Sequence, residues 1–368
     1  MTGRATEHTS SLTRPRHVVL LQTAVPAYRQ PVIDELDREL EGTLSLYCGS
    51  EGFERTVVLD VEHARFRLLR NHFLLGRRLL WQSGGLRGLL RADVVVMELN
   101  PRIVSSWFVL IARRLLGRRS ILWGHAWPRL GPSSRSEPLR NTMRRLADAI
   151  VVYTESQSRE LARVMPSASI AAAPNALYSR AEHPFRAPTS PARDIVFSGR
   201  LIDAKKPMLL VDAFLAVRDS LPADARLVVM GDGPLREALE RRASTAGDQV
   251  VFEGTVTDYD SLERIHGRAL CSVSPGYVGL SLVQSLWFGV PCVIARDEPH
   301  SPEIEAAVEG ANAVFVASDS SEELGSALVE MAARDAMWAE RRSAIAAECR
   351  DRYSVEAMVA AMARLIRG

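Results

Sequence analysis

The chain has 368 residues, of which 47% are hydrophobic and 24% are charged, and its formal net charge is +2. That composition is ordinary for a soluble globular protein, and the length predicts about two domains. No stretch reaches the roughly 18 apolar residues of a membrane-spanning helix, which excludes an integral membrane protein of that kind.

Charge is divided unevenly along the chain. Residues 1–190 hold 27 Arg against 17 acidic residues, a net of +10, whereas residues 191–368 hold 17 Arg and 2 Lys against 27 acidic residues, a net of −8. A basic first half is suited to facing anionic lipid or an anionic acceptor. Nucleic acid is not an expected partner, because no recognition motif accompanies the charge.

The first residues of the chain and the cysteines favour a cytoplasmic protein. Residues 1–16 lack the apolar core of a secretory signal, and we interpret them as a frayed tail. The four cysteines have neither metal-binding nor disulfide spacing, which fits a reducing compartment; they are Cys48, Cys271, Cys292 and Cys349.

Short apolar runs alternate with stretches of helical length from residue 17 onward. In the first half the predicted strands are 17–23, 44–49, 93–99, 120–126, 149–155 and 169–175. The basic and apolar stretch 74–93 allows two interpretations, a membrane-surface segment or a helix pair covering the first domain. Residues 178–193 are rich in Pro, Ser and Arg and form the best linker candidate.

The second half repeats the alternation. Its predicted strands are 194–201, 226–233, 250–256, 271–276 and 291–297, and 320–367 are predicted to form consecutive helices that cap the second domain. Buried strands that alternate with helices indicate parallel sheets, so we predict an α/β protein with two doubly wound domains. The predicted domains are 1–177 and 194–352, with a linker at 178–193 and a last helix at 353–368 that either stays on the second domain or crosses back to the first.

Three loops of the second half have the chemistry of a phosphate site. The stretch FSGRLIDAKKP (197–207) follows a strand and holds the only two lysines, Lys205 and Lys206, in a chain with 44 arginines. VVMGDGP (228–234) and SPGYVGLSLVQ (274–284) place glycine turns after strands. A helix starting near Leu280 would leave the amides of Leu280, Ser281 and Leu282 free for a phosphate.

The order of these segments resembles the family four group of retaining nucleotide-sugar glycosyltransferases. The resemblance rests on GRL…K, GDGP, FEGTV, GLSLVQSLWFGVPCVIA and PEIEAAVEGANAVFV, within residues 194–318. PAYRQPVIDEL (26–36), ILWGHAW (121–127) and APNAL (173–177) match more loosely. The resemblance implies the GT-B fold, two Rossmann-like domains facing across a cleft, with the donor nucleotide held mostly by the second.

The family's functional residues carry over onto matching positions. The resemblance implies that Arg200 and Lys205 neutralise the donor diphosphate, and that His125 lies beside the reacting sugar. We expect Lys206 to point to solvent or to help at the rim, since adjacent side chains cannot share one direction. The remaining predicted donor-binding residues are Gly199, Gly231, Asp232, Gly233, Val256, Gly279, Leu280, Ser281, Leu282, Gln284, His300 and Glu303.

The family's pair of glutamates is replaced. Aligned on Gly289-Val290-Pro291, their positions hold Gly276 and Gln284. An amide can still bond ribose hydroxyls, but a glycine offers no side chain. Glu303 is a candidate substitute or an ordinary first-turn glutamate, and His300 is a candidate sugar contact.

The sequence predicts no metal and no cofactor. Asp258-Tyr259-Asp260 has the spacing of a DxD metal site, but Asp258 also fits as a helix N-cap. The expected activity is metal-independent transfer, with retention, of a sugar from a UDP-, GDP-, ADP- or dTDP-sugar. The acceptor could be lipid-linked, a polysaccharide or a small glycoside. Two alternatives remain open, a non-catalytic sugar-nucleotide-binding partner and an epimerase on the same fold.

Overall fold

The computed structural model describes residues 15–54, 58–128, 131–188 and 191–368. The chain divides into two compact units. Unit 1 consists of Met1–Ala173 with Val355–Gly368, and unit 2 of Pro174–Ser354. The predicted frayed tail lies, except for its last two residues, outside the described residues.

Unit 1 is built on a seven-stranded parallel sheet. In space the strands run in the order β3-β2-β1-β6-β7-β8-β9. Their bounds are β1 (Val18–Gln22), β2 (Leu44–Cys48), β3 (Phe66–Leu68), β6 (Val94–Glu98), β7 (Arg119–Trp123), β8 (Ala149–Val152) and β9 (Ser169–Ala172). The central strands are buried almost throughout, as their continuous apolar runs predict.

Helices cover this sheet, and the start of one of them is fixed by a side-chain cap. They are α1 (Gln30–Glu39), which follows the short 3₁₀ turn Ala27–Arg29, α2 (Leu86–Arg91), α3 (Val104–Leu115), α4 (Glu137–Leu146), α5 (Glu155–Val164) and α12 (Val355–Arg367). The start of α5 is fixed by the Thr154 side chain, which accepts a 3.0 Å hydrogen bond from the Gln157 amide.

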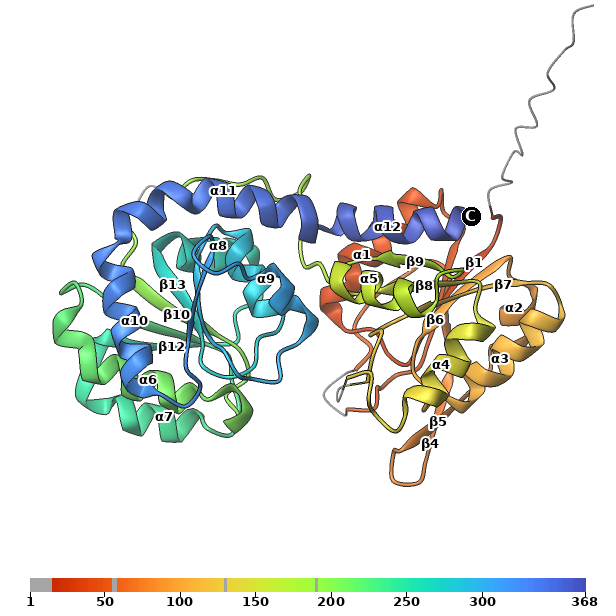
Figure 1. Cartoon of the computed structure of the whole chain (residues 1–368), viewed down its shortest axis with the longest axis horizontal. Coiled ribbons are helices and arrows are strands. Elements are labelled where there is room, and N and C mark those ends of the chain that lie inside the picture. Colours follow the sequence, from red (N-terminus) through yellow and green to blue (C-terminus); the bar gives the residue numbers. More distant parts are fainter. Residues whose placement is uncertain (1–14, 55–57, 129–130, 189–190) are drawn as a thin grey trace, which may run out of the picture. The chain divides into compact units, whose positions relative to one another are not determined.

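The stretch 74–93 is not a helix pair, and that interpretation was wrong. An antiparallel hairpin of β4 (Arg70–Leu74) and β5 (Leu79–Ser83) is followed by the single helix α2. Leu75, Gly76 and Arg77 all have positive φ, between 50° and 65°, so they form a tight reversal that no helix can contain. The hairpin projects from unit 1 (Figure 1).

Unit 2 has a six-stranded parallel sheet in the order β12-β11-β10-β13-β14-β15. The strands are β10 (Asp194–Ser198), β11 (Leu227–Met230), β12 (Val250–Gly254), β13 (Ala269–Ser274), β14 (Cys292–Ala295) and β15 (Ala313–Val316). The order reverses between β10 and β13, as in a dinucleotide-binding sheet. The predicted fold class, two doubly wound parallel-sheet domains, is confirmed.

The helices of unit 2 include α6, α7 and α10, which gather on one side of its sheet (Figure 1). The helices are α6 (Pro207–Val217), α7 (Arg236–Ala243), α8 (Tyr259–Arg268), α9 (Leu280–Trp287), α10 (Ser321–Ala333) and α11 (Asp335–Tyr353), with short 3₁₀ turns at Asp203–Lys205, Arg218–Ser220, Ser244–Gln249 and Pro302–Ala306. Asp258 is the N-cap of α8, and its carboxylate accepts from the Ser261 amide at 2.8 Å.

Two segments near the predicted domain boundaries, the predicted linker and the last helix, can be assigned to one unit each. The predicted linker lies within unit 2. There His183 stacks on Tyr259 with ring centroids 3.8 Å apart. The predicted helices at 320–367 are present as α10, α11 and α12, but α12 belongs to unit 1.

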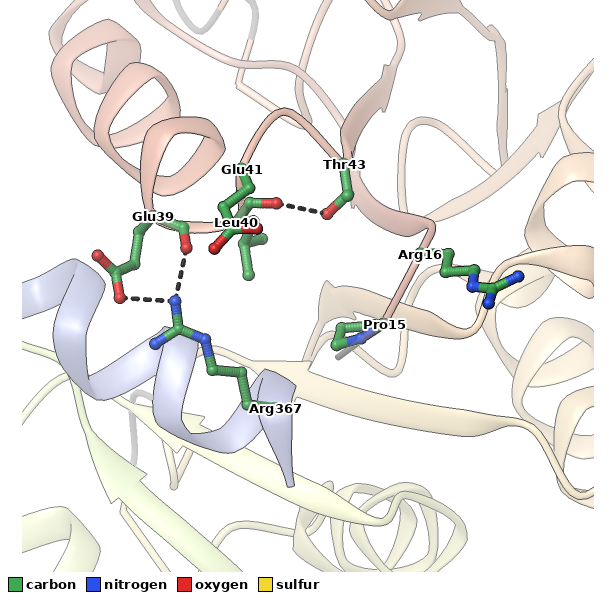
Figure 2. Close-up of a pocket in the computed structure, with 7 residues that line it drawn as sticks. All are labelled: Pro15, Arg16, Glu39, Leu40, Glu41, Thr43 and Arg367. Atoms are coloured by element: carbon green, nitrogen blue, oxygen red, sulfur yellow. Dashed lines mark hydrogen bonds and ion pairs between the residues drawn. The ribbon is translucent and has the colours of Figure 1, made fainter. Parts of the chain in front are cut away.

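The helix α12 packs against α1 inside unit 1. Its buried face includes Met358 and Met362, each 1% exposed or less. Arg367, at its end, donates to the Glu39 backbone oxygen at 2.6 Å and pairs with the Glu39 carboxylate at 2.7 Å, as Figure 2 shows. Both ionic side chains are more than a third exposed, so the apolar face contributes most of the attachment.

We therefore expect Met362→Ala to lower the free energy of unfolding of unit 1 by about 2–5 kcal/mol, because it leaves a cavity in a packed interface. Arg367→Ala should cost less than about 1 kcal/mol, as exposed ion pairs do. Denaturant unfolding of the two variants measures both values. Equal losses would contradict an attachment dominated by apolar packing.

Candidate functional site

The loops after β10 and β13 meet where the strand order of unit 2 reverses. These two strands are neighbours in the sheet, so the loops that follow them lie side by side at the carboxyl ends of the strands. The first loop, 199–206, contains Arg200, Lys205 and Lys206, and the second, 275–279, leads into α9. The predicted phosphate-type loops are thus brought together at the edge where such sheets bind ligands.

The two adjacent lysines point in different directions. The Lys205 ammonium donates to the Tyr277 carbonyl at 2.7 Å and lies 3.6 Å from the centre of the Tyr277 ring. Lys206 has left-handed backbone (φ 51°), and its ammonium contacts the Glu298 carboxylate at 2.5 Å and the Asp319 carboxylate at 2.7 Å. Two acidic side chains hold the Lys206 ammonium, so it does not extend freely into solvent, and the alternative that Lys206 helps at the rim of the site stays a prediction.

The electrostatic environments of the lysines are opposite. Burial, and then the charge of Arg200, lower the pKa of Lys205 to about 8, and Glu303 offsets only part of this effect. Burial also acts to lower the pKa of Lys206, but its bonds to Asp319 and Glu298 outweigh burial and raise it. Lys206 is neutralised by the protein, whereas Lys205 is a cation that would gain from an anionic ligand.

The N-terminus of α9 adds further positive potential beside Lys205. Gly279 is the N-cap and has no side chain to cap the helix. A Cβ placed on Gly279 would lie 3.7 Å from the Lys205 ammonium, so the amine and the helix start are in contact range. A helix N-terminus carries partial positive charge and amides suited to phosphate.

Leu282 does not contribute to that set of donors. Its amide donates to the Gly279 carbonyl at 3.1 Å, in a tight first turn, and the residue is 1% exposed. The prediction of a free Leu282 amide was wrong for this reason. The helix does begin at Leu280, and Leu280 and Ser281 lie in its first turn.

Glycines allow the loop after β11 to pack against the loop after β10. A Cβ at Gly231 would lie 1.9 Å from the Gly199 carbonyl oxygen, and one at Gly233 would lie 2.5 Å from the Leu201 carbonyl oxygen. Asp232 is exposed and its carboxylate accepts from the Gly233 amide at 2.7 Å. These glycines allow the close approach of two backbones at this edge of the sheet.

Gly276 is required by the same kind of approach. A Cβ there would lie 2.4 Å from the Ala204 carbonyl oxygen and 2.9 Å from the Lys205 Cα. No glutamate can occupy this position while the 199–206 loop keeps its path. Gly276 therefore allows the loop before α9 to pack directly on the backbone that carries Lys205.

Gln284 uses both ends of its amide within the protein. Its oxygen accepts from the Ser198 hydroxyl at 3.1 Å, and its nitrogen donates to the Tyr178 hydroxyl at 2.9 Å. It thereby ties α9 to the end of β10 and to the chain that enters unit 2. Val256, another predicted donor residue, is half-buried and packs against the core of unit 2.

His300 links two loops of the site through both ring nitrogens. Nδ1 accepts from the Val278 amide at 3.0 Å, so Nε2 carries the proton and donates to the Ala295 carbonyl at 2.9 Å. Burial is the main cause that lowers its pKa, which favours this neutral form. In this arrangement His300 positions the loop before α9.

Glu303 is a buried carboxylate near Lys205. It is 7% exposed and accepts a 2.6 Å hydrogen bond from the Asn175 amide. It lies in the 3₁₀ turn Pro302–Ala306, and its charge acts on Lys205. The interpretation of Glu303 as an ordinary exposed helix glutamate was wrong.

His125 belongs to unit 1. It follows β7, is exposed, and makes an edge contact with Tyr153 at 4.9 Å between ring centroids. Its carbonyl accepts from Arg140 at 3.0 Å.

Sequence reasoning missed Tyr277, Tyr178 and Asn175 as parts of the site. Tyr277 holds Lys205, Tyr178 holds Gln284, and Asn175 holds Glu303. Asn175 lies in APNAL, a segment whose resemblance to the family was the only available signal. Tyr277 contacts Lys205 through its backbone carbonyl. Every residue has this group, so the residue type gives no sign of the contact.

The crowding at Gly276 gives a direct test. Gly276→Ala should lower the free energy of unfolding by about 1–3 kcal/mol, because its Cβ overlaps the backbone of the Lys205 loop. Gly267, within α8, has nothing within 4 Å of its added Cβ. As the matched control, Gly267→Ala should leave stability unchanged or raise it by up to about 1 kcal/mol. A neutral result for Gly276→Ala in denaturant unfolding would refute the described loop contact.

Residues 192–334 match the model of the family described as glycosyl transferases group 1. A curated relative in Mycobacterium tuberculosis, GDP-mannose-dependent alpha-(1-6)-phosphatidylinositol dimannoside mannosyltransferase, is 36% identical over 105 residues, 28% of this chain and 27% of that protein. A second, from Campylobacter jejuni, is an alpha-1,4-N-acetyl-D-galactosaminyltransferase acting on a GalNAc-containing diNAcBac-PP-undecaprenol. It is 33% identical over 97 residues, 26% of this chain and 27% of its own. The matches thus span about a quarter of each relative's length.

Solved structures resemble the chain over nearly its full length. Anabaena HepE in complex with UDP has a TM-score of 0.68 at 14% identity, covering 95% of this chain and 99% of that one. Sucrose-phosphate synthase from Thermosynechococcus elongatus has a TM-score of 0.64 at 16% identity, covering 96% and 98%. Residues 192–334 are thus similar to the group 1 glycosyl transferases, and the chain has the GT-B fold.

Proposed function

We propose that the chain is a glycosyltransferase that moves a sugar from a nucleoside diphosphate donor to an acceptor hydroxyl. The observation that carries this proposal is the position of the Lys205 ammonium at the start of α9, where the charge of Arg200 also acts on it. A diphosphate would supply the negative charge that this site lacks. In this proposal residues 194–352 hold the donor, and the first domain, residues 1–177 with the helix at 353–368, holds the acceptor.

The chemistry follows from charge stabilisation. As the bond between the anomeric carbon and the diphosphate oxygen breaks, negative charge grows on the leaving diphosphate, where Lys205 and Arg200 stabilise it. The acceptor oxygen bonds the anomeric carbon, and its proton passes to the leaving phosphate. We propose retention of configuration, as in the family resembled. The cationic side chains take the charge-neutralising role, so we propose no metal requirement.

The remaining residues take supporting roles in this proposal. Gly199 and the 231–233 loop, together with Val256, would border the nucleotide, and Leu280 and Ser281 would donate amides to phosphate. Glu303 would supply the carboxylate for the sugar in place of Gly276, with His300 and Gln284 holding the site together. His125 would contact the sugar from unit 1. Thermal-shift measurements with UDP, GDP, ADP and dTDP distinguish the bases.

The acceptor class is supported by the relatives. Two of them act, by their names, on phosphatidylinositol dimannoside and on an undecaprenol diphosphate glycan. No helix among the described residues is both long and apolar enough to cross a bilayer. We propose a lipid-linked acceptor, reached from the cytoplasmic face by peripheral contact through the basic first half of the chain.

The role of Lys205 is tested by single substitutions. Lys205→Ala should lower kcat by about 10²–10³, the cost of losing one preorganised group that stabilises the leaving charge. Lys205→Arg should restore only part of the rate, because a planar guanidinium does not fit a point-charge site. Lys206→Ala should cost less than about tenfold. Donor turnover at saturating donor is the measurement, and near-wild-type rates for Lys205→Ala would reject the proposed function.

The lowered pKa of Lys205 predicts a pH dependence of binding. The amine is protonated below about pH 8 and neutral above it, so nucleoside diphosphate affinity should fall as pH rises through that value. From pH 7 to 9 the loss should approach about tenfold. Calorimetry with UDP and GDP measures it. In Lys205→Ala the affinity should be weaker and nearly flat with pH; an unchanged slope would assign the titration to another group.

A further inference from the structure

The outer side of α3 in unit 1 is apolar although it is exposed. Phe108, Ile111 and Leu115 are 48%, 47% and 84% exposed, and their spacing places them along one stripe of the helix. The opposite side is fixed by Arg113, which is fully buried and donates to the carbonyls of Ala92 at 2.9 Å and Asp93 at 3.1 Å. The helix is therefore held with its apolar stripe outward.

An apolar pocket adjoins this stripe. It has a volume of about 250 Å³ and lies among β5, α2 and α3. Leu21, Leu69 and Leu89 are buried residues of its lining. Trp81, Leu86 and Phe108, which also line it, are 40%, 45% and 48% exposed. The pocket is thus continuous with the exposed stripe through Phe108.

The same part of the chain is strongly basic. Residues 66–118 contain ten arginines and two acidic residues, Asp93 and Glu98, which gives a net charge of +8. On the two helices beside the pocket, Arg87, Arg91 and Arg114 are exposed. Exposed apolar side chains flanked by cations suit a surface that is both apolar and anionic.

We propose that this lipid-docking face, made of Trp81, Leu86, Phe108, Ile111 and Leu115 with Arg87, Arg91 and Arg114, binds an anionic lipid bilayer. The pocket takes part of one hydrocarbon chain, and the arginines contact lipid phosphates. A second copy of the chain is a poor occupant, because two faces of the same strong positive charge repel each other. This inference deepens the proposed membrane contact and rests on the proposed function only for the identity of the acceptor.

The test is vesicle co-sedimentation of the full chain, with neither donor nor acceptor present. Binding is expected to vesicles of phosphatidylcholine with 30% phosphatidylglycerol, at least about tenfold above pure phosphatidylcholine, and to weaken in 1 M salt. The paired variants Ile111→Ser/Leu115→Ser and Arg87→Ser/Arg91→Ser should each lose about tenfold or more. Val164→Ser and Arg159→Ser/Arg163→Ser, exposed positions on α5, are matched controls that should bind normally.

Pocket insertion has its own readout. Trp81 fluorescence, taken as the difference between wild type and Trp81→Phe, should shift to shorter wavelength and be quenched by brominated lipid. Equal loss in the α5 controls, equal binding to neutral vesicles, or a dimer in vesicle-free solution that Leu115→Ser abolishes would each overturn the proposal. Nucleotide binding measured on the same variants separates the lipid-docking proposal from the proposed function. It should be unchanged even where vesicle binding is lost.

Discussion

The close approach of loop backbones at the edge of the unit 2 sheet determines the rest of the site. Side chains are excluded at Gly231, Gly233 and Gly276, where a Cβ would lie 1.9–2.5 Å from a carbonyl oxygen. Because the loops pack backbone to backbone, Lys205 is held over Tyr277 and at the start of α9. A larger residue at any of these positions would displace the loop that carries the ammonium.

This packing concentrates positive charge that the protein compensates only in part. Burial and the charge of Arg200 lower the pKa of Lys205, and the charge of the buried Glu303 offsets only part of that lowering. The neighbouring Lys206 shows the alternative, since Glu298 and Asp319 neutralise it inside the protein. An enzyme that stabilises a leaving diphosphate needs the first kind of lysine, in which the counter-charge comes from the substrate. The contrast also explains how adjacent lysines can have different roles.

The sequence predicted the sheets and the loops that carry the site, because continuous apolar runs and glycine turns are local signals. The sequence distinguished Lys205 from Lys206 only by the family resemblance and by the opposite directions of adjacent side chains, and the structure separates them through the left-handed backbone at Lys206. The hairpin at 70–83, the tight first turn that uses the Leu282 amide, and the clamp on Gln284 by Ser198 and Tyr178 were not predicted. Each depends on contacts between distant segments or on backbone angles, which composition and spacing do not encode.

The opposite charges of the two halves give a reason for keeping these functions on separate units. Residues 191–368 carry a net −8, which opposes the approach of a phosphate, and in the proposed donor site Lys205, Arg200 and the start of α9 would attract one. This repulsion would not prevent phosphate binding at Lys205, because exposed charges farther than about 8 Å away are screened at physiological salt, whereas Lys205 would act at contact distance. Residues 1–190, at +10, have the reverse preference, which is the charge that the proposed contact with an anionic bilayer requires. If the proposed membrane contact holds, the charge of each half favours docking through the first half of the chain and disfavours it through the second.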